Sequence, residues 1–317
     1  MKICILGGTG FIGRKLAIFL ANQGYSIIIP SRNPQLLKDL KVLPSVQIIP
    51  LDLHKEEEVL KVVYGCEIVI NTIGILNEKR GEKNKFKYIH VKFLKKILSA
   101  CIQSKVHHFI HISALKANAE NGASKYLKSK GEGEKIIKHL SKDKINFTIL
   151  QPSVVFGEKD NFINLFTQLI KIFPVIPLAG HKTKFAPLYV EDLCKIIQLS
   201  INNHRTFNKT LQLCGPEVFT LKEIIIKIAK IHSINRKIIG IPKILAYVQA
   251  FIFTYIVPGK ILTFDNLKSL SIDSVCTKND LKLIGLLDLS ELSLKMKEYL
   301  NKDDQQKKFS NLRNKKV

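Results

Sequence analysis

A tyrosine and a lysine four residues apart are the side chains of this sequence most suited to acid–base chemistry. Tyr126 and Lys130 lie in the stretch YLKSK, and a spacing of four places both on one face of a helix. A free tyrosine has a pKa of about 10, and a neighbouring ammonium group lowers that pKa by favouring the tyrosinate. We therefore predict that this pair can move a proton at neutral pH, although Tyr-x-x-x-Lys alone is a common chance pattern.

A second group of residues, GGTGFIG (7–13), has the spacing of a phosphate-binding loop. It follows an apolar run and opens an amphipathic one, so it joins a strand to a helix. Gly7 would allow the tight turn, Gly10 would let the backbone approach a pyrophosphate, and Gly13 would let the helix pack closely on the strand. The helix N-terminus would supply free N–H groups to the phosphates. The alternative is a tight turn that binds no ligand.

The end of the second strand is where nucleotide-binding folds distinguish NAD from NADP. An NAD site usually carries an acid there for the ribose 2′-OH, but this chain reads IIIPSRNP, with Ser31 and Arg32 in that place. A guanidinium can bind a 2′-phosphate through two hydrogen bonds. We therefore predict that NADP(H) is the preferred cofactor, with NAD(H) as the other cofactor to consider. A solvated Arg32 without a ligand is the alternative interpretation.

Strand-like apolar runs alternate with helical patterns through the first half of the chain, and these elements must position the candidate residues. The expected strands are residues 2–6, 26–30, 46–52, 66–74, 106–113 and 146–157, and the clearest helices are 11–23 and 86–104. Continuous apolar strands that alternate with helices indicate a parallel sheet covered on both faces. The predicted fold class is α/β, a Rossmann-type doubly wound parallel sheet with a smaller, mostly helical C-terminal lobe.

The alternation of strands and helices breaks after residue 157. We expect residues 1–157 to form an NAD(P)-binding Rossmann domain that is completed by about 184–214. Residues 158–183 and 215–300 would form a C-terminal lobe for substrate or docking, and 301–317 a basic, disordered tail. The run ILAYVQAFIFTYIV (244–257) has helical spacing but is shorter than the roughly 20 residues that span a bilayer. Such a helix would be buried in its own lobe, in a partner or at a membrane surface.

The net charge of +24, from 50 Lys and Arg against 26 Asp and Glu, favours anionic partners. The lysines form no single block, so we expect no nucleic-acid surface and consider peripheral contact with an anionic membrane instead. The six cysteines are scattered without a CxxC pair and are expected to be small core residues in a reducing compartment. Because His107, His108 and His111 have no suitably spaced cysteine or acidic partner, we predict no metal site.

The loop GGTGFIG, Ser113 and the stretch YLKSK together resemble the extended and atypical short-chain dehydrogenases/reductases. The resemblance implies that Ser113, Tyr126 and Lys130 are the catalytic set, with Ser113 polarising a substrate carbonyl and Lys130 bonding the nicotinamide ribose. The implied cofactor contacts are Gly7, Thr9, Gly10, Phe11, Ile12, Gly13, Ser31, Arg32, Asp52, Leu53, Thr72, Gly74, Tyr126, Lys130, Pro152 and Val155. Asp52 resembles the family's adenine-contacting acid. Gln151 stands where most relatives have a basic residue.

Longer stretches, among them FIHISALKANAENGASKYLKSKGEGEKII and KFAPLYVEDL, resemble the NAD(P)H-binding accessory subunit of respiratory complex I and its bacterial homologues. This resemblance covers residues 1 to about 220. It implies a protein that holds the dinucleotide without turnover and meets a respiratory or ubiquinone-biosynthesis membrane complex. Because the chain has no mitochondrial presequence, we expect a bacterial cytoplasmic protein, peripheral at the inner face of the inner membrane. The alternative is an active NADP-dependent reductase or epimerase that uses the intact Ser–Tyr–Lys set.

Overall fold

The computed structural model describes residues 1–255, 262–286 and 288–301. The chain divides into two compact units. Unit 1 comprises Met1–Ser153, Val190–Leu213 and Cys276–Leu287, and unit 2 comprises Val154–Tyr189, Cys214–Val275 and Asp288–Val317. The segment 276–287 thus belongs to unit 1, although the sequence placed it in the C-terminal lobe. The tail expected at 301–317 lies, apart from its first residue, outside the described residues.

A seven-stranded sheet forms the centre of unit 1, with the strand order β11-β6-β5-β4-β1-β2-β3. Its strands are β1 (Lys2–Leu6), β2 (Ser26–Ser31), β3 (Val46–Pro50), β4 (Ile68–Asn71), β5 (His108–Ile112), β6 (Asn146–Pro152) and β11 (Lys209–Leu213). Every neighbouring pair in the sheet is parallel. The predicted Rossmann-type fold class is therefore confirmed, and the strand order reverses between β1 and β4.

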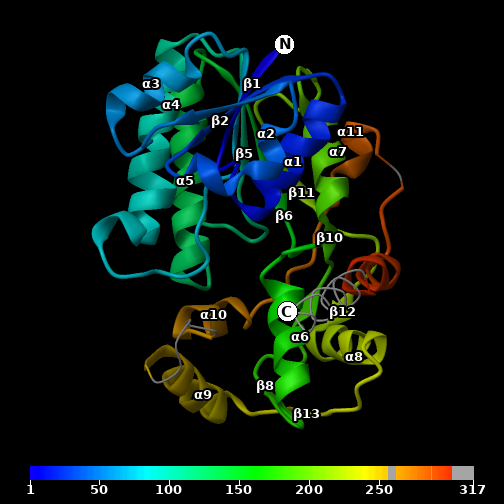
Figure 1. The fold of residues 1–317 in the computed structure, drawn as a ribbon. Helices are drawn as coiled ribbons and strands as arrows, with labels where there is room; N and C mark the ends of the chain where they lie inside the picture. The colour runs from blue at the N-terminus through cyan, green and yellow to red at the C-terminus, as the bar shows by residue number, and fades with distance from the viewer. Residues whose placement is uncertain (256–261, 287, 302–317) are drawn as a thin grey trace. The chain divides into compact units, whose positions relative to one another are not determined.

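Two layers of helices cover this sheet (Figure 1). The elements are α1 (Phe11–Asn22), η1 (Pro34–Leu36), α2 (Lys38–Lys41), α3 (Glu56–Val63), η2 (Glu82–Asn84), η3 (Tyr88–Phe93), α4 (Leu94–Gln103), α5 (Lys125–Ser141), α7 (Val190–Ser200) and α11 (Leu281–Ile284). In one layer α1 packs against α7, and in the other α3, α4 and α5 pack together. The helix expected at 86–104 differs at its start, because η3 is a π-helical turn that passes into α4.

The core of unit 1 follows from the apolar strands. Cys4 and Ile5 are neighbours in β1 and are both fully buried. Successive side chains of a strand point to opposite faces, so both faces of the sheet must be covered. On one face Cys4 belongs to a cluster with Leu98, Phe109 and Ile149, which come from α4, β5 and β6. This burial fixes the strand ends at which the candidate residues lie.

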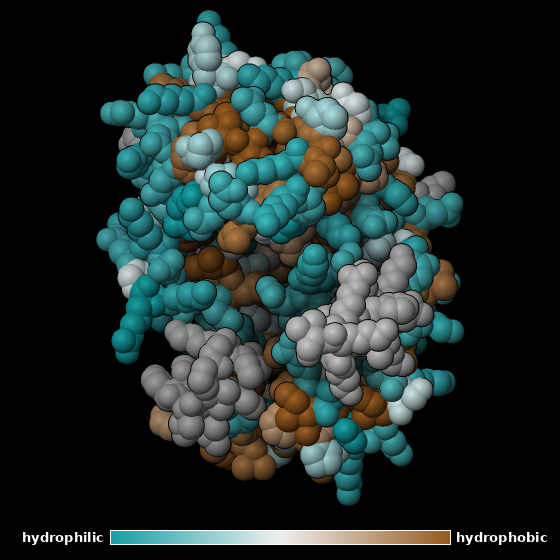
Figure 2. Space-filling model, in the orientation of Figure 1, coloured by the Kyte–Doolittle hydropathy of each residue, from teal (hydrophilic) through white to brown (hydrophobic). Residues whose placement is uncertain are grey.

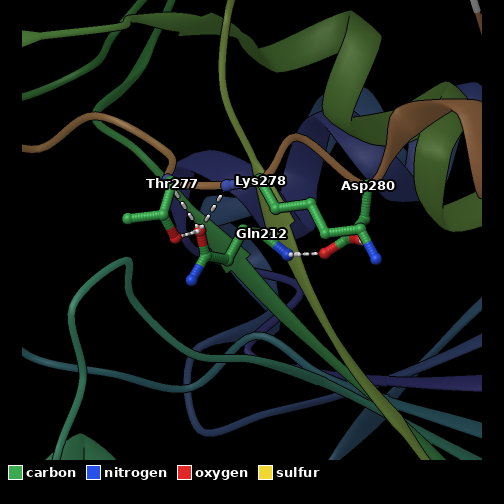
Figure 3. A network of polar contacts seen from close by, with 4 residues as sticks. All are labelled: Gln212, Thr277, Lys278 and Asp280. Atoms are coloured by element: carbon green, nitrogen blue, oxygen red, sulfur yellow. Dashed lines mark hydrogen bonds and ion pairs between the residues drawn. The ribbon is translucent and has the colours of Figure 1, made fainter.

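The outer edge of β11 is closed by the segment 276–287 of unit 1. The Gln212 N–H donates to Asp280 Oδ2 (3.0 Å), and the Asp280 N–H donates back to the Gln212 carbonyl (3.0 Å). The side-chain oxygen of Gln212 accepts from the N–H and the hydroxyl of Thr277 (3.1 Å each) and from the Lys278 N–H (3.5 Å) (Figure 3). An open strand edge would expose unpaired N–H and C=O groups, so this network completes the sheet.

Unit 2 is built from helices and short strand pairs. Its helices include α6 (Phe162–Ile172), α8 (Leu221–Ile231), α9 (Lys243–Tyr255) and α10 (Phe264–Ser269), and residues 292–301 are also helical. Its strands pair as β7 (Val155–Phe156) with β10 (Leu188–Tyr189), β9 (Lys184–Phe185) with β12 (Phe219–Thr220), and β8 (Val175–Leu178) with β13 (Lys237–Gly240). Phe156, Ile163, Ile170, Ile224 and Leu292 lie together in its core. The C-terminal part is therefore mostly helical, as predicted.

The apolar run expected to be helical at 244–257 forms α9 as far as Tyr255, and its last two residues lie outside the described part. Ala246 and Ala250 are buried, and Gln249 Nε2 donates to the Pro177 carbonyl (2.9 Å), so this side of α9 packs on unit 2. Most of its larger described side chains are exposed instead. Among the residues that the structure describes, no helix is both long enough and apolar enough to cross a membrane.

The cysteines differ from the expectation in one respect. Cys214 and Cys276 are disulfide-bonded, whereas Cys4, Cys66, Cys101 and Cys194 are free and buried. The interpretation of all six as reduced core residues is therefore wrong for two of them.

Candidate functional site

The sequence-predicted residues of unit 1 gather at one edge of its sheet. The loop 7–13 follows β1, Ser31 ends β2, Asp52 follows β3, Thr72 follows β4, Ser113 follows β5, and Pro152 ends β6. Parallel strands place their carboxyl ends at the same edge, and ligands of doubly wound sheets bind there where the strand order reverses. Here the reversal lies between β1 and β4, which are the strands that carry the glycine loop and Thr72. Val155 lies in β7 and belongs to unit 2.

The glycine loop has the close contacts that its spacing predicted. Gly7 has a φ of +84°, in the left-handed region that favours glycine. A Cβ added at Gly7 would lie 2.7 Å from Thr72 Oγ1, and one added at Gly13 would lie 2.3 Å from the Gly7 carbonyl oxygen. Thr72 in turn donates its hydroxyl to the Leu6 carbonyl (2.9 Å). The two glycines therefore let the loop, the first helix and the turn after β4 pack against one another.

Gly10 and the start of α1 have the features of a phosphate cradle. No side chain caps α1, whose N-cap residue is Gly10, and a Cβ at Gly10 would meet only the Gly7 carbonyl, at 3.3 Å. Gly10 and Thr9 are exposed, and Phe11 and Ile12 are half-buried. The first N–H groups of a helix bind phosphate well, since they have no partner within the helix. These residues fit the pyrophosphate of a dinucleotide, which would supply hydride chemistry when bound.

The far end of the site would receive the adenosine half. Ser31 is buried and its hydroxyl accepts the Asn33 N–H (3.1 Å), while Arg32 is exposed. Asp52 and Leu53 are half-buried, and Asp52 Oδ1 accepts the His54 N–H (3.1 Å). Burial by itself would raise the pKa of Asp52, but that hydrogen bond and the charges of His54 and Arg32 outweigh it and lower the pKa. The charges of His54, Arg32 and Lys83 therefore act on the residue expected at the adenine.

Lys130 lies at the other end, beside Gly74. Its Nζ donates to the Ile112 carbonyl (3.0 Å). A Cβ added at Gly74 would lie 3.2 Å from the same Nζ. The side chain is buried, and burial lowers the pKa of Lys130 to about 8, an effect that the charge of Glu134 opposes. A buried ammonium next to a residue without a side chain can donate to ribose hydroxyls that approach over Gly74.

Tyr126 lies on the same face of α5 as Lys130, but its ionisation differs from the expectation. Its ring makes edge contacts with Phe86 (5.8 Å between centroids) and His90 (5.7 Å). Burial raises the pKa of Tyr126 to about 12. The expectation that Lys130 lowers this pKa is therefore not met, because burial of the phenol disfavours the charged tyrosinate.

Ser113 is engaged with a buried acid that the sequence analysis did not single out. Its hydroxyl donates to Glu134 Oε1, and the Gln151 amide donates to both oxygens of Glu134 (2.9 and 3.0 Å). Burial raises the pKa of Glu134, and the hydrogen bonds from Ser113 and Gln151 act against that rise. The missed signal was spacing, since Tyr126, Lys130 and Glu134 are each four residues apart on one helix face. Gln151, where a basic residue was expected, is thus the partner of Glu134.

His90 is a second residue at this end that the sequence analysis missed. It is buried, its Nδ1 lies 2.8 Å from Ser129 Oγ, and its Nε2 accepts the Ile75 N–H at 3.2 Å. A lone histidine inside a helical pattern gives no signal of its own, so only the fold identifies it. Within the described residues, no group of three or more His, Cys, Asp or Glu side chains is arranged to hold a metal ion.

Comparisons with known proteins agree with this geometry. The model of a family described as NAD(P)H-binding matches residues 7–167. The chain is 33% identical over 225 residues to the mitochondrial NADH dehydrogenase (ubiquinone) 1 alpha subcomplex subunit 9 of Dictyostelium discoideum, covering 70% of this chain and 61% of that protein. It is 31% identical over 227 residues to the subunit of the same name from Rattus norvegicus, covering 70% and 58%. The chain thus spans about three fifths of the length of these relatives.

Solved structures support the fold. The UDP-glucuronic acid 4-epimerase from Bacillus cereus, in complex with UDP-glucuronic acid and NAD, superposes with a TM-score of 0.72. It is 19% identical, and the match covers 95% of this chain and 99% of that chain. A likeness at this identity shows a common fold and leaves function to the site itself.

Proposed function

This chain belongs to the NAD(P)H-binding family, and we propose that it holds a nicotinamide dinucleotide as an accessory or assembly factor of a quinone-linked respiratory system. That system would be complex I or ubiquinone biosynthesis. The observation that carries the holding role is the bond between Ser113 and Glu134. The respiratory setting is supported by the names of the relatives, about three fifths of whose length the chain spans.

The hydrogen bond of Ser113 to Glu134 supports holding without turnover. A hydroxyl has one proton, and Ser113 donates it to Glu134 rather than keeping it for a substrate carbonyl. Polarising a carbonyl would break that bond and leave a buried carboxylate with one donor fewer. Lys130 remains suited to bond the ribose hydroxyls, which anchors a cofactor without chemistry.

We propose that the held cofactor is NADP(H) in preference to NAD(H). Ser31 occupies the end of β2, where an NAD site would have an acid. Arg32 is exposed next to it, and its charge and that of Lys83 both lower the pKa of Asp52. A 2′-phosphate brought to this end would therefore meet positive charge and a guanidinium able to bind it through two hydrogen bonds.

The surface proposed to meet the membrane lies on unit 2. Its apolar residues come from α9 (Ile244, Leu245, Val248, Phe251), from the end of α6 and start of β8 (Ile172, Phe173, Val175), and from β13 (Ile239), and all are exposed. We call these eight residues the apolar face. The elements are joined by the β8–β13 pairing and by the hydrogen bond from α9 to β8, and brown, hydrophobic surface lies over this part of unit 2 (Figure 2). Groups of exposed apolar residues mark interaction sites.

Charge favours an anionic lipid surface as the occupant of the apolar face. Lys171, Lys237 and Lys243 are exposed beside it. The segments 162–185 and 230–264, from which the face is built, contain no Asp or Glu. An apolar helix face rimmed by lysines inserts among headgroups while the ammonium groups meet anionic lipids. We therefore propose a peripheral position at the inner face of a bacterial inner membrane.

One preparation can test the holding role. The full-length protein is purified without added nucleotide, denatured, and the released material is identified by chromatography and absorbance. We expect NADPH or NADP⁺ in near-stoichiometric amount, and Tyr126→Phe to retain it and to support growth on respiratory substrates as the wild type does. Recovery of no nucleotide, or a Tyr126→Phe strain that behaves like the deletion, would overturn the holding role.

A reductase or epimerase is the second candidate. It is favoured by one observation, the presence of Tyr126 and Lys130 on one face of α5 at the nicotinamide end. The test is NADPH oxidation by the purified protein with carbonyl substrates and quinones, and loss of that activity in Tyr126→Phe. Turnover that depends on Tyr126 would favour this candidate, whereas an unchanged NADPH signal would favour holding.

A further inference from the structure

His90 links three segments at the nicotinamide end of the site. It sits in the π-turn η3, and its Nε2 accepts the N–H of Ile75, in the turn after β4. Its Nδ1 lies 2.8 Å from Ser129 Oγ on α5, and that hydroxyl also donates to the Tyr126 carbonyl (2.8 Å). A π-turn inserts one extra residue into a helix and is frequent at functional sites. One imidazole thus ties η3 to the 71–75 turn and to the helix of Tyr126.

These bonds define the tautomer and the charge of His90. Since the Ser129 hydroxyl gives its proton to the Tyr126 carbonyl, His90 Nδ1 must be the donor to Ser129. Nε2 faces an N–H donor and must carry a lone pair. The neutral ring satisfies both hydrogen bonds. A second proton, on Nε2, would place an N–H donor opposite the N–H of Ile75. Burial and the neighbouring Lys130 and His111 lower the pKa of His90 to about 2, which agrees with this assignment.

The groups around His90 converge on Gly74. The ring stacks on Phe86 (5.6 Å, 19°) and meets the Tyr126 ring edge-on. A Cβ added at Gly74 would lie 3.2 Å from Lys130 Nζ and 3.7 Å from His90 Nε2. The spacing between the turn at Gly74 and the helix face of Tyr126 and Lys130 is therefore set by the His90 ring.

We propose that His90 is the positioning residue for the nicotinamide half of the dinucleotide. It keeps Lys130 and Tyr126 at the distance from Gly74 that the ribose and the nicotinamide ring require. It does so as a neutral imidazole that makes one hydrogen bond through each ring nitrogen. The proposal rests on the proposed function, because it assumes that unit 1 binds a nicotinamide dinucleotide. We expect the adenosine half to bind near Arg32 and Asp52. The His90 contacts described above do not include these residues, so binding of the two halves can be measured separately.

The test compares two probes on the full-length protein: NADPH, and 2′,5′-ADP, which lacks the nicotinamide half. The variant His90→Phe keeps an aromatic ring but removes both hydrogen bonds. We expect its NADPH affinity to fall roughly tenfold, which corresponds to about 1.4 kcal/mol, with 2′,5′-ADP affinity unchanged within about twofold. The bound NADPH should also show a shifted nicotinamide fluorescence. Equal losses for both probes, or no loss for either, would overturn the proposal.

Two further variants separate positioning from damage to the fold. Ser129→Ala leaves the imidazole in place and removes one of its hydrogen-bond partners. It should lower the affinity for NADPH by a smaller factor than His90→Phe does, and it should leave the affinity for 2′,5′-ADP unchanged. His139→Phe makes the same substitution at an exposed position of α5 and should change neither affinity; an equal effect there would overturn the proposal. Wild-type protein that binds neither probe would refute the proposed function itself, which keeps the two failures distinct.

Discussion

The Ser113 hydroxyl donates to the buried carboxylate of Glu134, and the side-chain amide of Gln151 donates a hydrogen bond to each of the two carboxylate oxygens. Three elements thus meet in one buried polar cluster: β5 and β6 through the ends of their strands, and α5 through the helix face of Tyr126 and Lys130. Buried polar clusters are rigid when every member is satisfied. The serine of the apparent catalytic set therefore serves the architecture of the site.

Ser113→Ala should weaken the fold more than it weakens nucleotide binding. It leaves Glu134 with one donor fewer, and removing one partner of a buried charged group costs about 1–3 kcal/mol of the free energy of unfolding. We expect nucleotide content and affinity to stay within about twofold of wild type. Denaturant unfolding and nucleotide titration measure the two effects. A variant of normal stability that no longer holds nucleotide would show that Ser113 contacts the ligand.

Arg32→Ala should lower the affinity for NADPH and leave that for NADH unchanged. A bidentate guanidinium–phosphate contact is worth about 1.5–3 kcal/mol, or roughly ten- to a hundredfold. Calorimetric titration of both nucleotides against both proteins gives the answer. Arg205→Ala, at an exposed arginine after α7, is the matched control. Equal wild-type affinities for the two cofactors would remove the proposed preference.

Gly10→Val should abolish nucleotide binding while the fold persists. A Cβ at Gly10 meets only the Gly7 carbonyl, at 3.3 Å, and the φ of −80° suits any residue. Gly13→Ala is the contrasting variant, because its Cβ would lie 2.3 Å from that oxygen and should destabilise the fold. Circular dichroism and nucleotide release distinguish them. If Gly10→Val still copurifies with nucleotide, the loop is not the phosphate cradle.

Acid should destabilise unit 1 sharply. Burial lowers the pKa of His90 to about 2, that of His108 to about 3 and that of His111 well below its usual range. Below about pH 6.5 these histidines are protonated in the unfolded chain but stay neutral in the folded chain. Each histidine then lowers the free energy of unfolding by about 1.4 kcal/mol per pH unit as the pH falls. Unfolding in urea at pH 7.5 and 5.5 measures this dependence.

His108→Gln supplies the control for that pH dependence. It removes one of the three buried groups and should reduce the loss of stability between pH 7.5 and 5.5 by about 1.4 kcal/mol. His139→Gln, at an exposed site, should leave the slope as it is. The same stability at pH 7.5 and 5.5 in the wild type would contradict the prediction.

Polar substitution on the apolar face should release the protein from membranes. Ile244, which is 79% exposed, and Phe251 point outward from α9, so Ile244→Asn with Phe251→Asn should lose binding to phosphatidylglycerol vesicles without loss of stability. Binding of the wild type should weaken with salt and with zwitterionic lipid. Leu36→Asn, at a 72% exposed leucine of unit 1, is the control. Wild-type protein that does not bind anionic vesicles would contradict the proposal of a lipid partner.

The sequence predicted the sheet and the loop at its carboxyl edge because both depend on local patterns. Apolar strands alternating with helices leave few arrangements, and the GGTGFIG spacing places Gly7 and Gly13 where a side chain would strike the backbone or Thr72.

Other features could not be predicted because they depend on contacts between distant segments. Glu134 and Gln151 are 17 residues apart in sequence and meet only once β6 lies beside β5. The pKa of Tyr126 is set by how deeply the phenol is buried, which spacing along α5 does not reveal. The exposure of Ile244 and Val248 on α9 required knowledge of which helix face packs on unit 2.

The bonds between Gln212 and the segment 276–287 have a consequence for the order in which this protein is made. Unit 1 needs its last piece to cover β11, and that piece follows most of unit 2 along the chain. A ribosome must therefore finish residues 154–275 before the nucleotide-binding unit can close. A fragment that stops near residue 213 would leave the outer edge of β11 uncovered and open to pairing with other chains.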